Sequence, residues 1–118
     1  MMNILIADDE EVLRMLIVDT LEEEGHVLTE AADGREAIEC FQEKTFDLLL
    51  LDYMMPRMTG IEVIRKVRET SDVKIVMLTA KTQQRNLEEA KEAGADFFLA
   101  KPFSPLKLIE LVTELEER

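Results

Sequence analysis

Several apolar stretches of this chain are short and unbroken, and the clearest is the run of four leucines from Leu48 to Leu51. No polar position interrupts it, as expected for a strand buried on both faces, and such strands are typical of parallel sheets in α/β proteins. Comparable short segments recur along the chain. We expect strands at residues 3–7, 27–31, 48–51, 73–78 and 96–100.

Most segments between these strands have apolar residues at every third or fourth position, which is the pattern of amphipathic helices. Gly25 and Gly94 stand where two of the helices should stop, and Ser104 with Pro105 forms a typical helix start. We expect helices at residues 10–24, 35–43, 61–69, 83–93 and 105–116.

The alternation of five strands with five helices predicts a parallel sheet with helices on both faces and right-handed crossovers. An alternation of this size suits the flavodoxin-like doubly wound fold, with strand order 2-1-3-4-5. The 118 residues contain no linker or repeat and fit one domain of ordinary size. We therefore predict a single α/β domain over residues 1–118.

The amino-acid composition argues against several classes of function. The net charge is -12, from 26 acidic against 14 basic residues, which argues against direct nucleic-acid binding and against anionic membrane surfaces. The one cysteine, Cys40, excludes an internal disulfide and is expected to be buried as a small apolar residue. No apolar run approaches the roughly 20 residues that span a bilayer. We expect a cytoplasmic protein.

Charged and polar side chains stand at the carboxyl ends of four predicted strands. Asp8 and Asp9 follow the first strand, Asp52 the third, Thr79 the fourth and Lys101 the fifth. In the predicted order these strands are neighbours, so the side chains should meet at one edge of the sheet, where ligands of open α/β sheets bind. Each type also has a simpler role: aspartates cap helices or begin turns, and a lysine before proline is usually solvated.

Three carboxylates in one cleft repel one another, and burial raises the cost of keeping them charged. A hard divalent cation relieves this repulsion, and Mg²⁺ prefers carboxylate oxygens and water. A magnesium site with a spare carboxylate, an ammonium and a hydroxyl can hold a phosphoryl group. The edge of the sheet is therefore a candidate site for phosphoryl chemistry.

The sequence resembles a known family over nearly its whole length, from Asn3 to the last helix. It is similar to the receiver domains of two-component response regulators. The matching segments, in order, are DDE at 8–10, LDYMMP at 51–56, Gly60, TA at 79–80 and KPF at 101–103.

The resemblance implies that Asp52 accepts a phosphoryl group from a phosphohistidine on a sensor histidine kinase or a phosphotransfer protein. It implies that Asp9, Asp52 and the backbone carbonyl of Met54 bind Mg²⁺ directly, and that Asp8 acts mainly through a bound water. On this reading the protein is a signalling phosphoacceptor. It is no enzyme beyond catalysing its own phosphorylation and dephosphorylation.

The same resemblance gives Thr79 a hydrogen bond to the phosphoryl group and pairs Lys101 with another of its oxygens. Phe98 matches the aromatic switch position, where many relatives have tyrosine. Met54 and Lys81 fall at positions that tune hydrolysis of the phosphoaspartate.

Two surfaces follow from this reading. The kinase must cover the edge that carries Asp52, and we expect it to contact Leu13, Arg14, Met55, Pro102 and Phe103. Output should use the surface formed by residues 83–93, 96–100 and 105–116. Exposed apolar residues of the last helix there suit a partner of unknown identity, or a second copy in a phosphorylation-dependent homodimer. A cis peptide before Pro102 would turn Lys101 back toward Asp52.

Three other readings stay open on the sequence. A haloacid-dehalogenase-type phosphatase needs its aspartates in an Asp-x-Asp pattern, whereas Asp8 and Asp9 are adjacent. A flavodoxin needs a Ser/Thr/Gly-rich phosphate loop where this chain has acids. A degenerate receiver, acting as a phosphorylation-independent binding module, would lack part of the acid set, Thr79 or Lys101. The chain end, without a new pattern, favours a stand-alone receiver.

Overall fold

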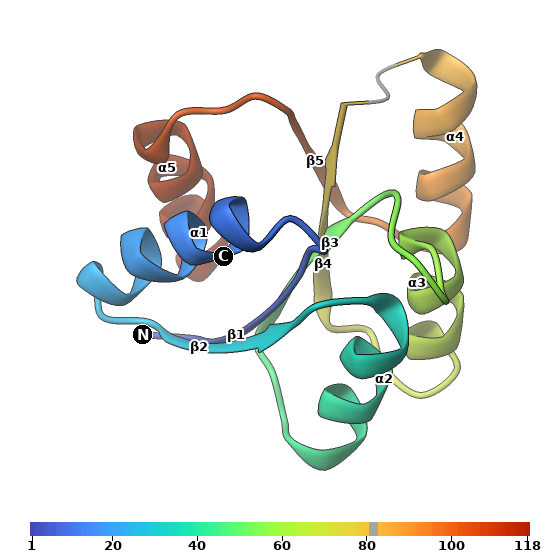
Figure 1. The fold of residues 1–118 in the computed structure, drawn as a ribbon, viewed down its shortest axis with the longest axis horizontal. Coiled ribbons are helices and arrows are strands. Elements are labelled where there is room, and N and C mark those ends of the chain that lie inside the picture. Colours follow the sequence, from blue (N-terminus) through green and yellow to red (C-terminus); the bar gives the residue numbers. More distant parts are fainter. Residues whose placement is uncertain (81–82) are drawn as a thin grey trace.

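The computed structural model describes residues 1–80 and 83–118, so Lys81 lies outside the described residues. The five strands form one parallel sheet in the order β2-β1-β3-β4-β5, and the predicted flavodoxin-like fold is confirmed (Figure 1). The strands are β1 (Asn3–Ala7), β2 (Val27–Ala31), β3 (Leu48–Asp52), β4 (Lys74–Thr79) and β5 (Phe97–Ala100). The helices are α1 (Glu11–Glu23), α2 (Gly34–Glu43), α3 (Gly60–Arg68), α4 (Gln84–Ala93) and α5 (Pro105–Glu116).

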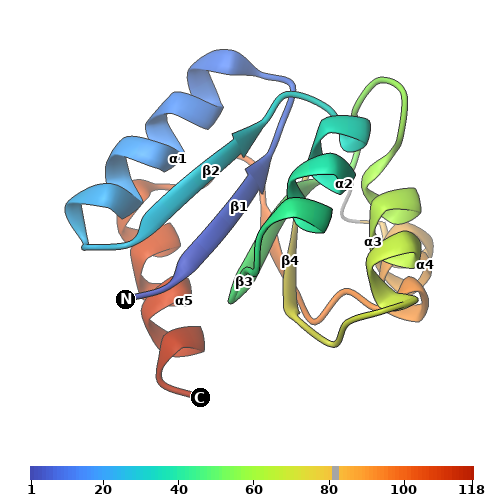
Figure 2. The ribbon, with the colours of Figure 1, turned by 90° about the horizontal axis from the view of Figure 1, so that it is seen from below.

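Helices cover both faces of the sheet, with α1 and α5 on one side and α2, α3 and α4 on the other (Figure 2). Successive residues of a strand point to opposite faces. In β3, Leu49 and Leu51 therefore pack toward α2 and α3, while Leu48 and Leu50 pack toward α1 and α5. All five residues of β3 are buried, which explains why this strand shows no apolar–polar alternation.

The start of α3 lies directly against the end of β3. A Cβ atom at Gly60 would lie 2.3 Å from the backbone oxygen of Asp52, so only glycine permits this approach. Thr59 caps the helix in a capping box with Glu62: each residue's side chain accepts a hydrogen bond from the other's backbone N–H. This local structure fixes the chain immediately after Asp52.

The observed elements differ from the predicted ones by a residue at some ends, as in α1, which begins at Glu11. Asp52 is the last residue of β3 rather than the first residue beyond it. The predicted cis peptide between Lys101 and Pro102 is confirmed. His26 in the loop before β2 is buried, and its Nδ1 accepts a hydrogen bond from the backbone N–H of Met2.

Cys40 is half-buried, and burial is the main cause that raises the pKa of its thiol, followed by the charge of Glu36. This environment agrees with the expected packing role. In the described part of the chain, no helix is long and apolar enough to cross a membrane.

Candidate functional site

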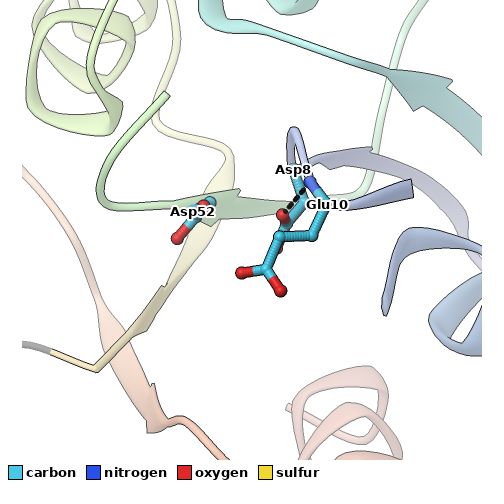
Figure 3. A group of neighbouring side chains, drawn as sticks. All are labelled: Asp8, Glu10 and Asp52. Atoms are coloured by element: carbon cyan, nitrogen blue, oxygen red, sulfur yellow. Dashed lines mark hydrogen bonds between the residues drawn. The ribbon is translucent and has the colours of Figure 1, made fainter. Parts of the chain in front are cut away.

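The ammonium of Lys101 lies among three carboxylates at the carboxyl edge of the sheet. Its Nζ is 3.0 Å from Asp8 Oδ2, 3.1 Å from Asp52 Oδ1 and 3.2 Å from Glu10 Oε1. The side chains of Asp8, Glu10 and Asp52 converge from two chain segments, as Figure 3 shows. One lysine thus neutralises part of a concentrated negative charge.

Asp8 is fully buried, and both its side chain and its backbone make hydrogen bonds. Its Oδ1 accepts a hydrogen bond from the backbone N–H of Glu10 (Figure 3), and its backbone N–H donates to the carbonyl of Ala31. Arg14 Nη1 donates to the backbone oxygen of Asp8 at 2.7 Å. The turn after β1 therefore presents this carboxylate in a fixed orientation.

Asp52 is only 6% exposed at the end of β3. Burial raises its pKa to about 6, and the negative charge of Asp8 adds to this, while Lys101 acts in the opposite direction. The chain beyond it is fixed by two backbone bonds: the N–H of Tyr53 donates to Leu78, and the N–H of Gly60 donates to Tyr53. The result is a poorly hydrated carboxylate on a rigid support.

Lys101 is positioned by the neighbouring strand, because its backbone N–H donates to the carbonyl of Thr79 at 2.9 Å. Burial disfavours its charged form, but the hydrogen bond to Asp8 and the charge of Asp52 hold its pKa above the ordinary value. Thr79 ends β4 and is almost fully buried. The structure thus brings Asp8, Asp52, Thr79 and Lys101 to one edge, as the strand order predicts.

A cleft of about 300 Å³, lined by Asp52, Thr79 and Lys101 among others, opens at this edge. Asp9, with an exposed side chain, lines it together with Met54 and Thr79. The close group of carboxylates, however, contains Glu10 rather than Asp9: oxygens of Asp8, Glu10 and Asp52 all lie within 4.8 Å of one another. Sequence reasoning did not assign a role to Glu10, although a third consecutive acid after β1 was the available signal.

The donor set fits a hard cation, since carboxylate oxygens are what Mg²⁺ selects, and the group of Asp8, Glu10 and Asp52 could hold a metal ion. Lys101 already binds all three of these carboxylates. A divalent cation would add charge next to the ammonium, and the two would compete for the same oxygens. Metal binding should therefore loosen the contacts of Lys101.

The residues expected at a kinase surface divide into two groups. Leu13, Pro102 and Phe103 line a second cavity of about 420 Å³ that shares Lys101 with the first cleft. Arg14 is mostly occupied inside the protein, because besides Asp8 it pairs with Glu30 at 3.0 Å. Met55 is 7% exposed and belongs to the core, which leaves little of its side chain for a partner.

Phe98, the expected switch residue, lies in β5 opposite Met77. It is half-buried and packs against the core cluster on the side of the sheet that α3 and α4 cover. An aromatic ring in this setting is neither locked in the core nor free in solvent.

Asp52 should make the metal-free fold more stable as the pH falls. Its folded pKa of about 6 exceeds the unfolded value of about 3.9. The stability that the folded protein gains by keeping Asp52 protonated is therefore fully present below about pH 4 and is lost as pH rises through about 6. In EDTA, wild type should be less stable than Asp52→Asn by up to about 3 kcal/mol near neutrality, and similar at about pH 4. Urea unfolding measures this, and a pH-independent difference would contradict the raised pKa.

Comparisons with known proteins agree with one another. A family model described as the response regulator receiver domain matches residues 4–113. The transcriptional regulatory protein SrrA of Staphylococcus aureus is 44% identical over 116 residues, covering 98% of this chain and 48% of that protein. The chain thus spans about half the length of the curated relatives it matches.

Solved structures give the same result. The chemotaxis protein CheY4 of Vibrio cholerae is 36% identical with a TM-score of 0.93, and the match covers 98% of both chains. The response regulator protein TrrA of Thermotoga maritima, in complex with Mg²⁺-BeF, is 37% identical with a TM-score of 0.86. That match covers 98% of this chain and 99% of TrrA.

Fold and site first define a class: flavodoxin-like α/β domains with an acidic, lysine-containing site at the carboxyl edge of the sheet. Within this class, the chain belongs to the response regulator receiver domains of two-component systems. These domains are signalling proteins, and the acidic pocket fits a phosphoacceptor site. The phosphatase and flavodoxin readings are thereby excluded.

Proposed function

We propose that this domain, residues 1–118 acting as one unit, accepts a phosphoryl group on Asp52 from a sensor histidine kinase or a phosphotransfer protein. The observation that carries the proposal is the position of Asp52: a poorly hydrated carboxylate, 3.1 Å from the Lys101 ammonium, at an open cleft. In the reaction an Asp52 carboxylate oxygen bonds to phosphorus while the bond from phosphorus to the donor's imidazole nitrogen breaks. The imidazole leaves with that electron pair.

The residues around Asp52 have separate roles in binding the phosphoryl group and the metal. Lys101, which already lies beside Asp52, pairs with a phosphoryl oxygen, and the Thr79 hydroxyl donates a hydrogen bond to another. When Mg²⁺ is bound, Asp9, Asp52 and the Met54 carbonyl would hold it, and Asp8 would act mainly through a water. When bound, the metal neutralises charge on the transferring group. The relative TrrA was solved with Mg²⁺-BeF, which supports a magnesium site in this chain.

We expect phosphorylation to require the metal, because two negatively charged reactants must meet in an acidic cleft. Acetyl phosphate with Mg²⁺ should add the mass of one phosphoryl group to the protein. Excess EDTA should slow the uptake at least about a hundredfold, equivalent to about 2.7 kcal/mol of transition-state stabilisation. Uptake that proceeds equally in EDTA would remove the metal from the mechanism.

The kinase is expected to dock over the cavity that Leu13, Pro102 and Phe103 line beside the site. We expect a donor histidine carried on a protein to reach Asp52 from this side, because this cavity shares Lys101 with the cleft over Asp52. An apolar surface rimmed by charge is typical of partner surfaces. Arg14 contributes by fixing the Asp8 turn, and Met55 is omitted because it is a core residue.

Leu13→Asp should slow phosphotransfer from a purified cognate kinase by roughly tenfold or more, as loss of an interface anchor does. Labelling by acetyl phosphate should stay close to wild type, since small donors need no docking surface. Val27→Asp is the matched control: Val27 is exposed at the start of β2, the opposite end of the sheet. Equal losses with both donors would make Leu13 a structural residue.

Phosphorylation should alter the surface of α4, β5 and α5. Movement of Thr79 toward the phosphoryl group frees space beside β5, into which Phe98 can turn. Leu106 of α5 is 64% exposed and offers apolar area to an output partner or to a second copy of the chain. The free-energy gap between the two states must be a few kcal/mol for one phosphoryl group to shift it.

A further inference from the structure

Helix α4 is weakly anchored by apolar contacts. It has one buried residue, Ala90, whereas α3 beside it buries five of its nine residues. Figure 1 shows α4 at the margin of the molecule, next to α3. With so little buried area, individual polar contacts carry a large share of what holds this helix in place.

One such contact comes from the residue directly after the phosphoacceptor. The Tyr53 hydroxyl donates a hydrogen bond to Glu89 Oε1 in the middle of α4, at 3.0 Å. Within residues 1–80 and 83–118, it is the one hydrogen bond that joins a side chain of α4 to another part of the molecule.

Tyr53 is a rigid support for this bond. Its backbone N–H donates to Leu78 of β4, and its carbonyl accepts from Gly60 at the start of α3. Its ring is half-buried and packs against the core cluster that contains Leu51 and Met77. The backbone of Tyr53 is therefore tied to β4 and α3, so a displacement of α4 away from this position should stretch or break the bond to Glu89.

We propose that Tyr53 and Glu89 form a latch that holds α4 in its resting position, and that phosphorylation of the adjacent Asp52 acts against this latch. The effect of phosphorylation on the latch rests on the function proposed above, whereas the latch itself does not. Tyr53 connects the site to α4 by a route that does not pass through Thr79 and Phe98. Its contribution favours the unphosphorylated state, so it raises the threshold for switching.

The resting latch can be tested without phosphorylation. Tyr53 is the one tyrosine, and the chain has no tryptophan, so intrinsic emission reports on this phenol alone. A hydrogen bond to a carboxylate quenches phenol emission, and Glu89→Gln should therefore brighten it. Glu89→Gln and Tyr53→Phe should each speed amide exchange in α4 roughly fivefold, the size expected for losing one charge-assisted bond at a partly exposed site. The double variant should add nothing further.

Glu92→Gln is the matched control, because Glu92 is exposed on the same helix and the same charge is removed. It should change neither emission nor exchange. Unchanged α4 exchange in both Glu89→Gln and Tyr53→Phe would overturn the latch. So would an equal effect of Glu92→Gln.

The link to phosphorylation is tested with beryllofluoride and Mg²⁺, which mimic the phosphoryl group. Glu89→Gln and Tyr53→Phe should each bind this analogue up to about fivefold more tightly than wild type, because the resting state has lost its latch. Wild-type affinity in both variants, despite faster α4 exchange, would refute the proposed coupling between phosphorylation and the latch. If wild type itself binds no beryllofluoride, the proposed phosphoacceptor function and its coupling to the latch fail together. The emission and exchange data still decide whether the latch holds α4.

Discussion

Asp52→Asn should abolish phosphoryl uptake from acetyl phosphate, lowering the rate at least about a hundredfold. The amide keeps the shape of the side chain but removes the nucleophilic oxygen. Asp8 is not available as a substitute, because it is fully buried and bonded to Lys101 and to the Glu10 N–H. Intact mass measured over time follows the reaction.

Asp72→Asn provides the control, since Asp72 is an exposed loop aspartate far from the site in sequence. It should take up phosphate at the wild-type rate. Because burial already disfavours the Asp52 charge, Asp52→Asn should fold at least as stably as wild type near neutral pH, so a loss of uptake cannot be ascribed to unfolding. Uptake within tenfold of wild type would mean that Asp52 is not the acceptor.

Lys101→Met should destabilise the metal-free protein by about 3 kcal/mol near neutral pH, the cost of removing one partner from a buried charge pair. Without the ammonium, Asp8 and Asp52 face each other at the end of the sheet with no cation. The pKa of Asp52 should then rise further. Protonation of Asp52 relieves the repulsion, so the difference from wild type should shrink as the pH falls.

Magnesium should restore much of this loss. Since Lys101 and the metal both bind the Asp52 carboxylate in the proposed site, the variant should gain more stability from Mg²⁺ than wild type does. Lys66→Met, which removes an exposed lysine paired with Glu69 on the surface, should cost under about 0.5 kcal/mol and leave the Mg²⁺ response unchanged. Urea unfolding with and without Mg²⁺ measures both. An equal Mg²⁺ gain in wild type and Lys101→Met would contradict competition at this site.

Much of the fold was predictable because its signals are local. The leucines of β3 lack alternation, since both faces of this strand are covered, and glycines mark the ends of α1 and α4. Strand order and register then brought residues 8, 52, 79 and 101 to one edge. These inferences need only the chain direction of parallel strands, which is why the candidate site followed from the sequence.

Side-chain partners could not be predicted in the same way. Arg14 was expected to face a partner, but it reaches back to Asp8 and Glu30. Met55 lies in a loop pattern yet packs into the core. The contacts of Glu10 with Lys101 and of Tyr53 with Glu89 join residues 91 and 36 positions apart. Such pairings depend on the three-dimensional arrangement of the helices, and no local pattern encodes them.

The location of the phosphoryl group tests the central claim most directly. After incubation with acetyl phosphate and Mg²⁺, borohydride reduces an acyl phosphate to an alcohol, which converts a phosphorylated aspartate into homoserine. Peptide mass spectrometry should then find homoserine at position 52, dependent on Mg²⁺ and at no other position. Homoserine at position 8 or 9, or a reduced residue at 52 that forms equally in EDTA, would contradict the assignment of Asp52 as the Mg²⁺-dependent phosphoacceptor.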